Sequence, residues 1–308
     1  MSWLYFVIIT VFVDALRIFI DNYVSDVYFK GRGAVSQKWF YGWVTIVFMS
    51  IILSIIGWDQ VFAQPMISGI LLCAGIISGI SGIFYLKALE IDDSTNLGIF
   101  IQMAPVLYLV FGWMFLGESF SPIQLVAFAI IMTAPVLIVL TTRKKSRKVR
   151  MKAVMYSFLY VLVSVISNMI FVEANGEMAN VLVSISLVLL GKGIENLIIV
   201  LVLPKLFRRY RTVVKNSHGK VFRPMCANFV VGMTKEYVYR MALILAPSMA
   251  IASAVSDTSG PIVIFFMGIV LTLIWPKFGR EKLNRKAVLV HLLATVLVVI
   301  GIVILQVK

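Results

Sequence analysis

The sequence has few of the residues from which soluble catalytic and redox sites are built. Only two cysteines and two histidines occur in 308 residues. Cys73 and Cys226 both lie inside long apolar runs, so we expect them to be packing residues and predict neither a disulfide framework nor a metal site. A glycine-rich phosphate loop and a zinc-ligand spacing are also missing from the sequence. We therefore predict that the protein is not an enzyme and uses no cofactor.

Charged residues are scarce as well. They make up 14% of the chain, whereas 61% of the residues are hydrophobic and the mean hydropathy is +0.99. A bilayer core of about 30 Å requires roughly 20 apolar residues per helix. The sequence thus predicts an all-α integral membrane protein with ten transmembrane helices, at residues 3–24, 39–57, 62–83, 94–116, 122–141, 153–173, 180–203, 225–246, 249–275 and 288–306.

Acidic residues are half as numerous as basic ones, 14 against 28. The basic residues gather in alternate connections, at residues 25–38, 84–93, 142–152, 204–224 and 276–287, whereas the other connections contain none. Cationic loops stay in the cytoplasm, so this asymmetry predicts a protein of the cytoplasmic membrane with both termini outside the cytoplasm. The basic runs are then anchors near anionic lipid of the bilayer, and no nucleic acid partner is expected.

Short motifs recur at about half the chain length. Tyr85-x-x-Ala88-Leu89, followed by Ser94, returns 154 residues later, and the pair Pro105 and Gly112 returns 156 residues later. The later copies are Tyr239-x-x-Ala242-Leu243 with Ser248, and Pro261 with Gly268. We infer a duplication, with one repeat at 1–142, a basic linker at 143–152 and a second repeat at 153–308. Five spans per repeat reverse the orientation of the second copy, and such inverted repeats are typical of transporters.

The Tyr-x-x-Ala-Leu start, the proline within the span and the Gly117-Glu118 corner resemble the EamA repeat of the drug/metabolite transporter superfamily. The second copy departs from this pattern at its corner, where about two extra helical turns separate Gly268 from Glu281. The resemblance implies two inverted five-helix repeats around one central site. It also makes amino-acid export a common role to consider.

Charged residues inside the spans are the candidates for that site, because a charge facing lipid is costly. Asp14, Arg17 and Asp21 follow one stripe of the first span. A polar run before Pro261 resembles the discontinuous helices of transporters, and Pro105 should free a backbone carbonyl inside the fourth span. The predicted central cavity is lined by Asp14, Arg17, Gln102, Asn168, Lys192, Glu195, Lys235, Glu236, Tyr239, Arg240 and Asp257.

Two interpretations of these charges stay open. In one, Lys192 pairs with Glu195 and Arg240 with Glu236, so that the charges only satisfy each other. In the other, Lys192, Lys235 and Arg240 hold a carboxylate or phosphate of the substrate, as the resemblance to sugar-phosphate and nucleotide-sugar carriers implies. Alternatively, Asp257 or Glu236 is a candidate carrier of a coupling proton, because burial raises the pKa of a carboxyl group.

The leading hypothesis is a secondary transporter that moves a small polar or charged metabolite, an amino acid or another anionic or zwitterionic solute, by alternating access. A lipid-linked carrier or flippase and a membrane scaffold without transport activity are the alternatives. Monomer and homodimer are both compatible with the sequence.

Overall fold

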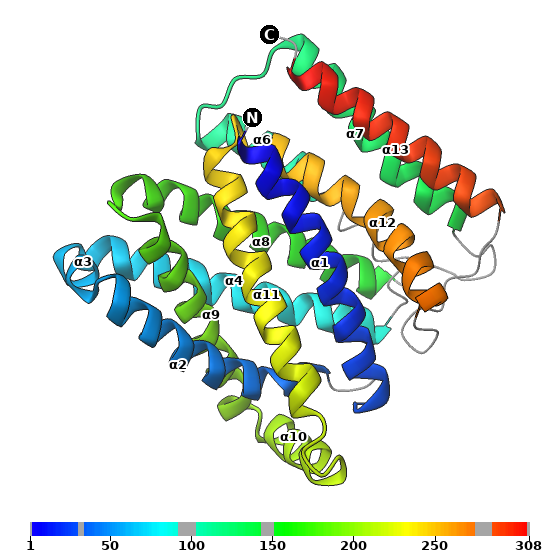
Figure 1. Ribbon diagram of the computed structural model, residues 1–308. Helices are drawn as coiled ribbons and strands as arrows, with labels where there is room; N and C mark the ends of the chain where they lie inside the picture. The colour runs from blue at the N-terminus through cyan, green and yellow to red at the C-terminus, as the bar shows by residue number, and fades with distance from the viewer. Residues whose placement is uncertain (1, 30–33, 92–102, 143–150, 275–284, 307–308) are drawn as a thin grey trace. The chain divides into compact units, whose positions relative to one another are not determined.

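A computed structural model describes residues 2–29, 34–91, 103–142, 151–274 and 285–306, and these residues form helices and short connections without a strand (Figure 1). In chain order the helices are α1 (Ser2–Val27), η1 (Ala34–Gln37), α2 (Lys38–Ile56), α3 (Trp58–Ala63), α4 (Pro65–Ile91), α6 (Ala104–Phe115), α7 (Pro122–Thr142), α8 (Met151–Glu177), α9 (Val181–Val202), α10 (Pro204–Asn216), α11 (Phe222–Leu245), α12 (Met249–Ile274) and α13 (Arg285–Gln306).

The helices agree with the predicted apolar segments. Each of the ten segments overlaps a helix, although the start of the segment at 94–116 lies outside the described residues. Six of the described helices, α1, α2, α4, α8, α9 and α12, are long and apolar enough to cross a membrane, and three apolar helices are shorter. α11 carries several charged residues in its second half. The chain is thus an all-helical, multi-pass membrane protein, whereas its ten-span inverted arrangement remains a prediction.

The chain forms two compact units that both draw on the two sequence halves. One unit comprises residues 1–23, 92–154 and 230–308, and we call it the α12 unit. The other comprises residues 24–91 and 155–229, and we call it the α9 unit. The duplicated halves predicted at 1–142 and 153–308 therefore do not correspond to separate globules.

In the α9 unit, α9 packs against both α2 and α4. The contact with α4 is a close approach of two glycines: a side chain on Gly75 would overlap the carbonyl oxygen of Val188, and one on Gly191 would overlap that of Leu72. Small residues allow two membrane helices to approach in this way. The close approach is confined to part of α4, because a side chain on Gly69 or Gly82 would meet none of the described residues within 4 Å.

In the α12 unit, α12 packs against α6, α7 and α13, and α13 packs along α7. Its apolar core joins α1 to α12 and includes Val7, Val11, Ile131, Ala242 and Ile251. α7 and α13 approach closely at Gly301, where a side chain would overlap Ile131.

The Gly117-Glu118 corner fixes the start of α12. Gly117 has φ of +63°, a conformation that favours glycine. The Glu118 carboxylate accepts hydrogen bonds from the Ser248 hydroxyl at 2.8 Å and the Met249 N–H at 3.3 Å, and Ser248 in turn accepts from the Ala250 N–H. An acid at a helix N-terminus satisfies backbone donors that have no partner within the helix. The motif thus ties the α6–α7 corner to α12.

Three local predictions need correction. α12 continues through Pro261 as one helix rather than breaking there. Pro105 lies in the first turn of α6, where a missing N–H is tolerated, so it is not in the middle of a helix, and the carbonyl it was expected to free lies outside the described residues. Cys73 and Cys226 are both exposed on their helices instead of packed inside.

Candidate functional site

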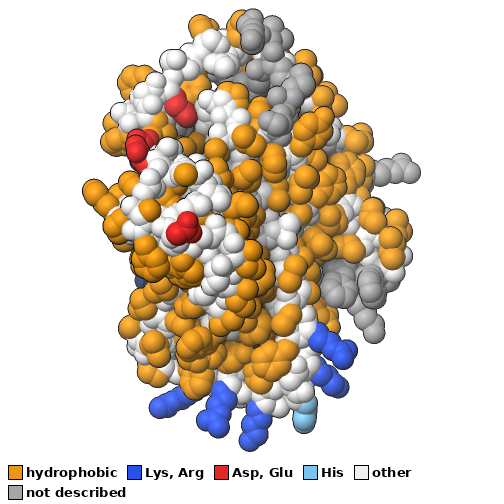
Figure 2. All heavy atoms as spheres, turned by 60° about the vertical axis from the view of Figure 1, so that its left-hand side comes forward, with side chains coloured by type: hydrophobic (Ala, Val, Ile, Leu, Met, Phe, Trp, Pro, Cys, Tyr) orange, Lys and Arg blue, Asp and Glu red, His pale blue; other side chains and the backbone are white. Residues whose placement is uncertain are grey.

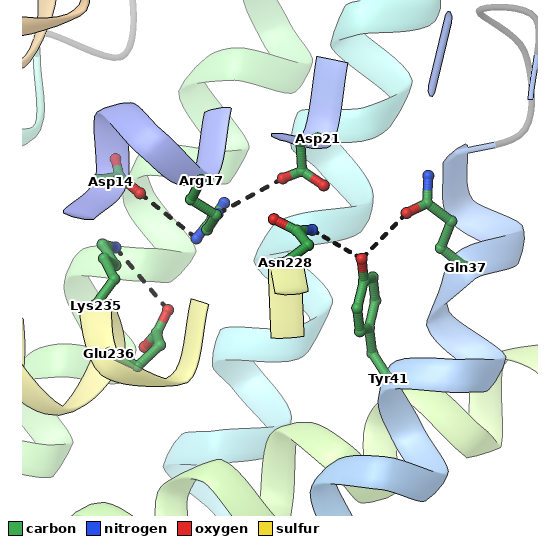
Figure 3. A network of polar contacts seen from close by, with 8 residues as sticks. All are labelled: Asp14, Arg17, Asp21, Gln37, Tyr41, Asn228, Lys235 and Glu236. Atoms are coloured by element: carbon green, nitrogen blue, oxygen red, sulfur yellow. Dashed lines mark hydrogen bonds and ion pairs between the residues drawn. The ribbon is translucent and has the colours of Figure 1, made fainter. Parts of the chain in front are cut away.

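The first part of the candidate site is the ionic stripe of α1. Arg17 lies 3.6 Å from Asp14 and 3.6 Å from Asp21 (Figure 3). Asp14 follows the buried residues Val7 and Val11 by seven and three positions, so the stripe shares the inward face of the helix. The opposite face exposes the apolar residues Tyr5, Ile9, Phe12 and Leu16.

The stripe faces inward and is still accessible. The side chains of Arg17, Asp14 and Asp21 are 30%, 36% and 38% exposed. Inward-facing charges with this exposure are not sealed in a packed core. Each pair is thus partly screened, and its net contribution to stability is about 0–1 kcal/mol.

α11 supplies the second group of charges. Glu236 lies 3.9 Å from Lys235 and 3.6 Å from Arg240, and the Lys235 ammonium also lies 4.9 Å from the centre of the Tyr239 ring. The Arg240 side chain is only 1% exposed. A fully buried cation must be paired, so Arg240 with Glu236 is a structural pair. This confirms the pairing that the four-residue spacing predicts.

α1 and α11 meet where α11 has a glycine. A side chain on Gly232 would contact Cδ of Arg17 at 3.5 Å. Gly232 precedes Glu236 and Tyr239 by four and seven positions, so these three residues share the face of α11 turned toward α1. The two charged groups thus belong to one place in the α12 unit.

α12 adds Asp257. Its carboxylate accepts a hydrogen bond from Ser253 at 2.6 Å. Pro261 has no N–H to donate to the main-chain carbonyl of Asp257. This turn of α12 therefore offers two hydrogen-bond acceptors, the Asp257 carbonyl and the Asp257 carboxylate.

We call this group the charged cluster, and it contains Asp14, Arg17, Asp21, Lys235, Glu236, Arg240 and Asp257. Most of the site residues expected from the sequence are therefore brought together in one compact unit. Acids outnumber bases in it by one. No three metal-ligating side chains gather anywhere in the described ranges, so the residues shown here offer no obvious site for a metal ion.

The other predicted site residues are elsewhere. Gln102 lies outside the described residues. Asn168 on α8, Lys192 and Glu195 on α9 belong to the α9 unit.

Glu195 forms a buried ion pair with a residue that sequence analysis missed. The Lys38 ammonium lies 3.0 and 2.9 Å from the two carboxylate oxygens of Glu195 and also donates to the Gly79 carbonyl oxygen at 3.1 Å. Their side chains are 10% and 4% exposed. The contact joins α2, α9 and α4. Glycine at position 79 leaves room for the Glu195 carboxylate, which a side chain would displace.

Lys38 was assigned to the basic connection 25–38 because it precedes the apolar run of α2. The glycine at position 79 and the acid inside α9 were visible in the sequence, but nothing local links them. A further polar chain in the α9 unit runs from Asn228 through the Tyr41 hydroxyl at 2.7 Å to Gln37 at 3.3 Å (Figure 3).

Comparisons with known proteins agree with this architecture. Residues 25–140 match the model of the EamA-like transporter family. No curated protein matches the chain. One solved crystal structure superposes on 99% of this chain and 96% of its own, with a TM-score of 0.60 and 11% sequence identity, and this likeness concerns the fold alone.

Proposed function

Because residues 25–140 match the EamA-like transporter family, we propose that the chain belongs to this family and is a secondary transporter that moves a small polar or charged metabolite by alternating access. The family consists of membrane transporters, which supports the general class. The charged cluster is the proposed substrate site. The observation that carries this assignment is the ionic stripe of α1, whose charges face inward and are nevertheless about one-third exposed.

A zwitterionic solute such as an amino acid fits the cluster best. The accessible carboxylates of Asp14 and Asp21 are suited to an ammonium group, and Lys235 is suited to a carboxylate. Arg240 is buried against Glu236 and is assigned a structural role. The excess of one acid makes a purely anionic solute the poorer fit, which differs from the anion-gripping role that sequence analysis considered for Lys192, Lys235 and Arg240.

Partner exchange by Arg17 is the proposed chemical step of the transport cycle. Its two contacts of 3.6 Å are longer than a charge-assisted hydrogen bond of about 2.7–2.9 Å. An incoming ammonium can therefore compete for either carboxylate at small cost. The sequence contains no ATP-binding motif, so the proposed driving force is a gradient of the solute or of a coupled ion. Asp257 on α12, which accepts a hydrogen bond from Ser253, is the proposed carrier of a coupling proton.

Counterflow in proteoliposomes tests the proposal. Purified protein is screened with labelled amino acids, sugar phosphates and nucleotide sugars. Asp14→Asn should then reduce the identified flux at least about tenfold, because it removes one of the two carboxylates around Arg17. Asp59→Asn, an exposed acid on α3, is the matched control and should leave flux unchanged. Absence of flux for all solutes, or equal flux in both variants, would contradict the site.

An imposed pH gradient tests coupling in the same vesicles. Asp257→Asn should abolish the response of the flux to the gradient while leaving counterflow at equal pH measurable. If the gradient has no effect on the original protein, the driving force is the solute gradient alone.

A further inference from the structure

The α10 helix is a folded element within a connection that the sequence analysis treated as a loop. Leu206, Tyr210 and Val213 recur at helical spacing and lie on the side that packs on α9 and η1. Burial raises the pKa of the Tyr210 hydroxyl, in keeping with its packed position. The polar side of the helix carries Lys205, Arg208, Arg209, Arg211 and Lys215, and all five are exposed.

The turn after α10 adds to this basic surface. His218 and Gly219 take positive φ angles of 49° and 76°, and the Gly219 N–H donates to the Val214 carbonyl oxygen at 3.2 Å. The chain thereby turns directly into α11, and the turn adds Lys220 and Arg223, which are also exposed. No acidic residue occurs between 204 and 224. Figure 2 shows basic side chains gathered at the end of the molecule where α10 lies in Figure 1.

Aromatic contacts indicate the depth of α10 in the bilayer. Phe207 of α10 stacks edge-on against Trp39 at 4.8 Å, and Trp39 contacts Trp43 at 5.9 Å. Trp and Tyr gather at the level of lipid headgroups, and these residues belong to the first turns of an apolar span. α10 also begins directly after the end of α9, at Pro204. These aromatic contacts favour a position of the basic face at headgroup depth.

We propose that the basic face of α10, made of Lys205, Arg208, Arg209, Arg211, Lys215, Lys220 and Arg223, is a binding site for the phosphate headgroups of anionic phospholipids. The positive surface complements a negatively charged leaflet. The neighbouring Phe207 and Phe222 are exposed and apolar, so they suit the acyl boundary beneath the headgroups. The opposite, apolar face of α10 packs on η1 and on α9, and α9 carries Glu195, the partner of Lys38.

Quenching of Trp39 tests this proposal in the full-length protein. The protein is reconstituted in phosphatidylcholine vesicles that contain brominated phosphatidylglycerol or brominated phosphatidylcholine at equal fraction. The Trp39 signal is obtained by subtracting the emission of Trp39→Phe. We expect stronger quenching by the anionic lipid, with a relative affinity at least about fivefold higher. Equal quenching by the two lipids would overturn the proposal.

Charge variants give the matched control. Arg208→Gln, Arg209→Gln and Arg211→Gln together should lower the preference for phosphatidylglycerol at least about fivefold. The same loss of charge in the linker, by Arg147→Gln, Lys148→Gln and Arg150→Gln, should leave Trp39 quenching unchanged. Replacing the three α10 arginines by lysine should preserve the preference for phosphatidylglycerol, because the positive charge is kept. This variant thus distinguishes loss of charge from a folding defect. An equal loss in both triple variants, or loss in the lysine variant, would contradict the site.

Soluble competitors distinguish the source of the phosphate. Inorganic phosphate should reverse Trp39 quenching no more than sodium chloride of the same ionic strength does. The reason is that the bound lipid is also held by its acyl chains, which inorganic phosphate lacks. If inorganic phosphate displaces the brominated lipid selectively, the surface binds free phosphate and not the membrane.

Discussion

Lys38 and Glu195 differ in kind from the charges of the cluster. The Lys38 ammonium contacts both carboxylate oxygens of Glu195 at short distance, and the two side chains are almost inaccessible. In the α1 stripe the ion-pair distances are longer, 3.6 Å, and the side chains are accessible. A buried pair has little room to exchange partners, because opening it leaves two desolvated charges. We therefore assign Lys38 and Glu195 to the architecture of the α9 unit and the α1 stripe to solute binding.

Removing one partner of the buried pair should be strongly destabilising. Lys38→Met leaves the Glu195 carboxylate without its cation, and the expected loss in free energy of unfolding is about 3–5 kcal/mol. Lys38→Met combined with Glu195→Met should recover most of that loss, because two apolar side chains of similar length need no pairing. Chemical unfolding in detergent micelles measures both values.

The control for this measurement is Lys87→Met. Lys87 is exposed and lies 5.6 Å from the centre of the Tyr156 ring, so its replacement should change stability by less than about 1 kcal/mol. A double variant as unstable as Lys38→Met alone would mean that the charges themselves are needed for folding.

At the scale of elements, the α4–α9 contact depends on the absence of side chains. Gly75→Ala places a Cβ against the Val188 carbonyl oxygen, and backbone cannot move aside as a flexible side chain would. The helices must separate, and the expected cost is about 1–3 kcal/mol. Unfolding in micelles and the yield of folded protein report this loss.

Gly82→Ala is the matched substitution on the same helix. Its side chain would meet no atom within 4 Å, and alanine is the better helix former by up to about 1 kcal/mol. The two substitutions should thus have opposite signs. If both destabilise the protein equally, α4 and α9 do not cross at Gly75.

For the whole molecule, several helices that the predicted duplication makes equivalent pack against each other. α6 packs on α12, α7 on α13 and α2 on α9, which pairs spans four and nine, five and ten, and two and seven. These contacts explain why the compact units mix the two halves, and the repeat itself stays a prediction. The contact of Glu118 with Ser248 also brings together two connections that the charge asymmetry predicts to lie outside.

Labelling from the two sides of the membrane tests this topology. After Cys73 and Cys226 are replaced by serine, Ser119→Cys should react with an impermeant maleimide on intact cells. Asn216→Cys, at the end of α10, should react only after permeabilisation, because basic connections remain in the cytoplasm. Reaction of both positions from the same side would contradict the predicted orientation.

Local sequence determined the helices, the membrane-spanning character and the resemblance to EamA-like transporters, because apolar run length and the Gly117-Glu118 corner are properties of neighbouring residues. It also determined which charges of α1, α11 and α12 are candidates for the site, since a charge within an apolar run needs a polar environment. The tertiary structure decided their partners. Lys38 with Glu195, Glu118 with Ser248 and Gly75 with Gly191 join residues far apart in sequence. Such contacts depend on how helices cross, which periodicity does not encode.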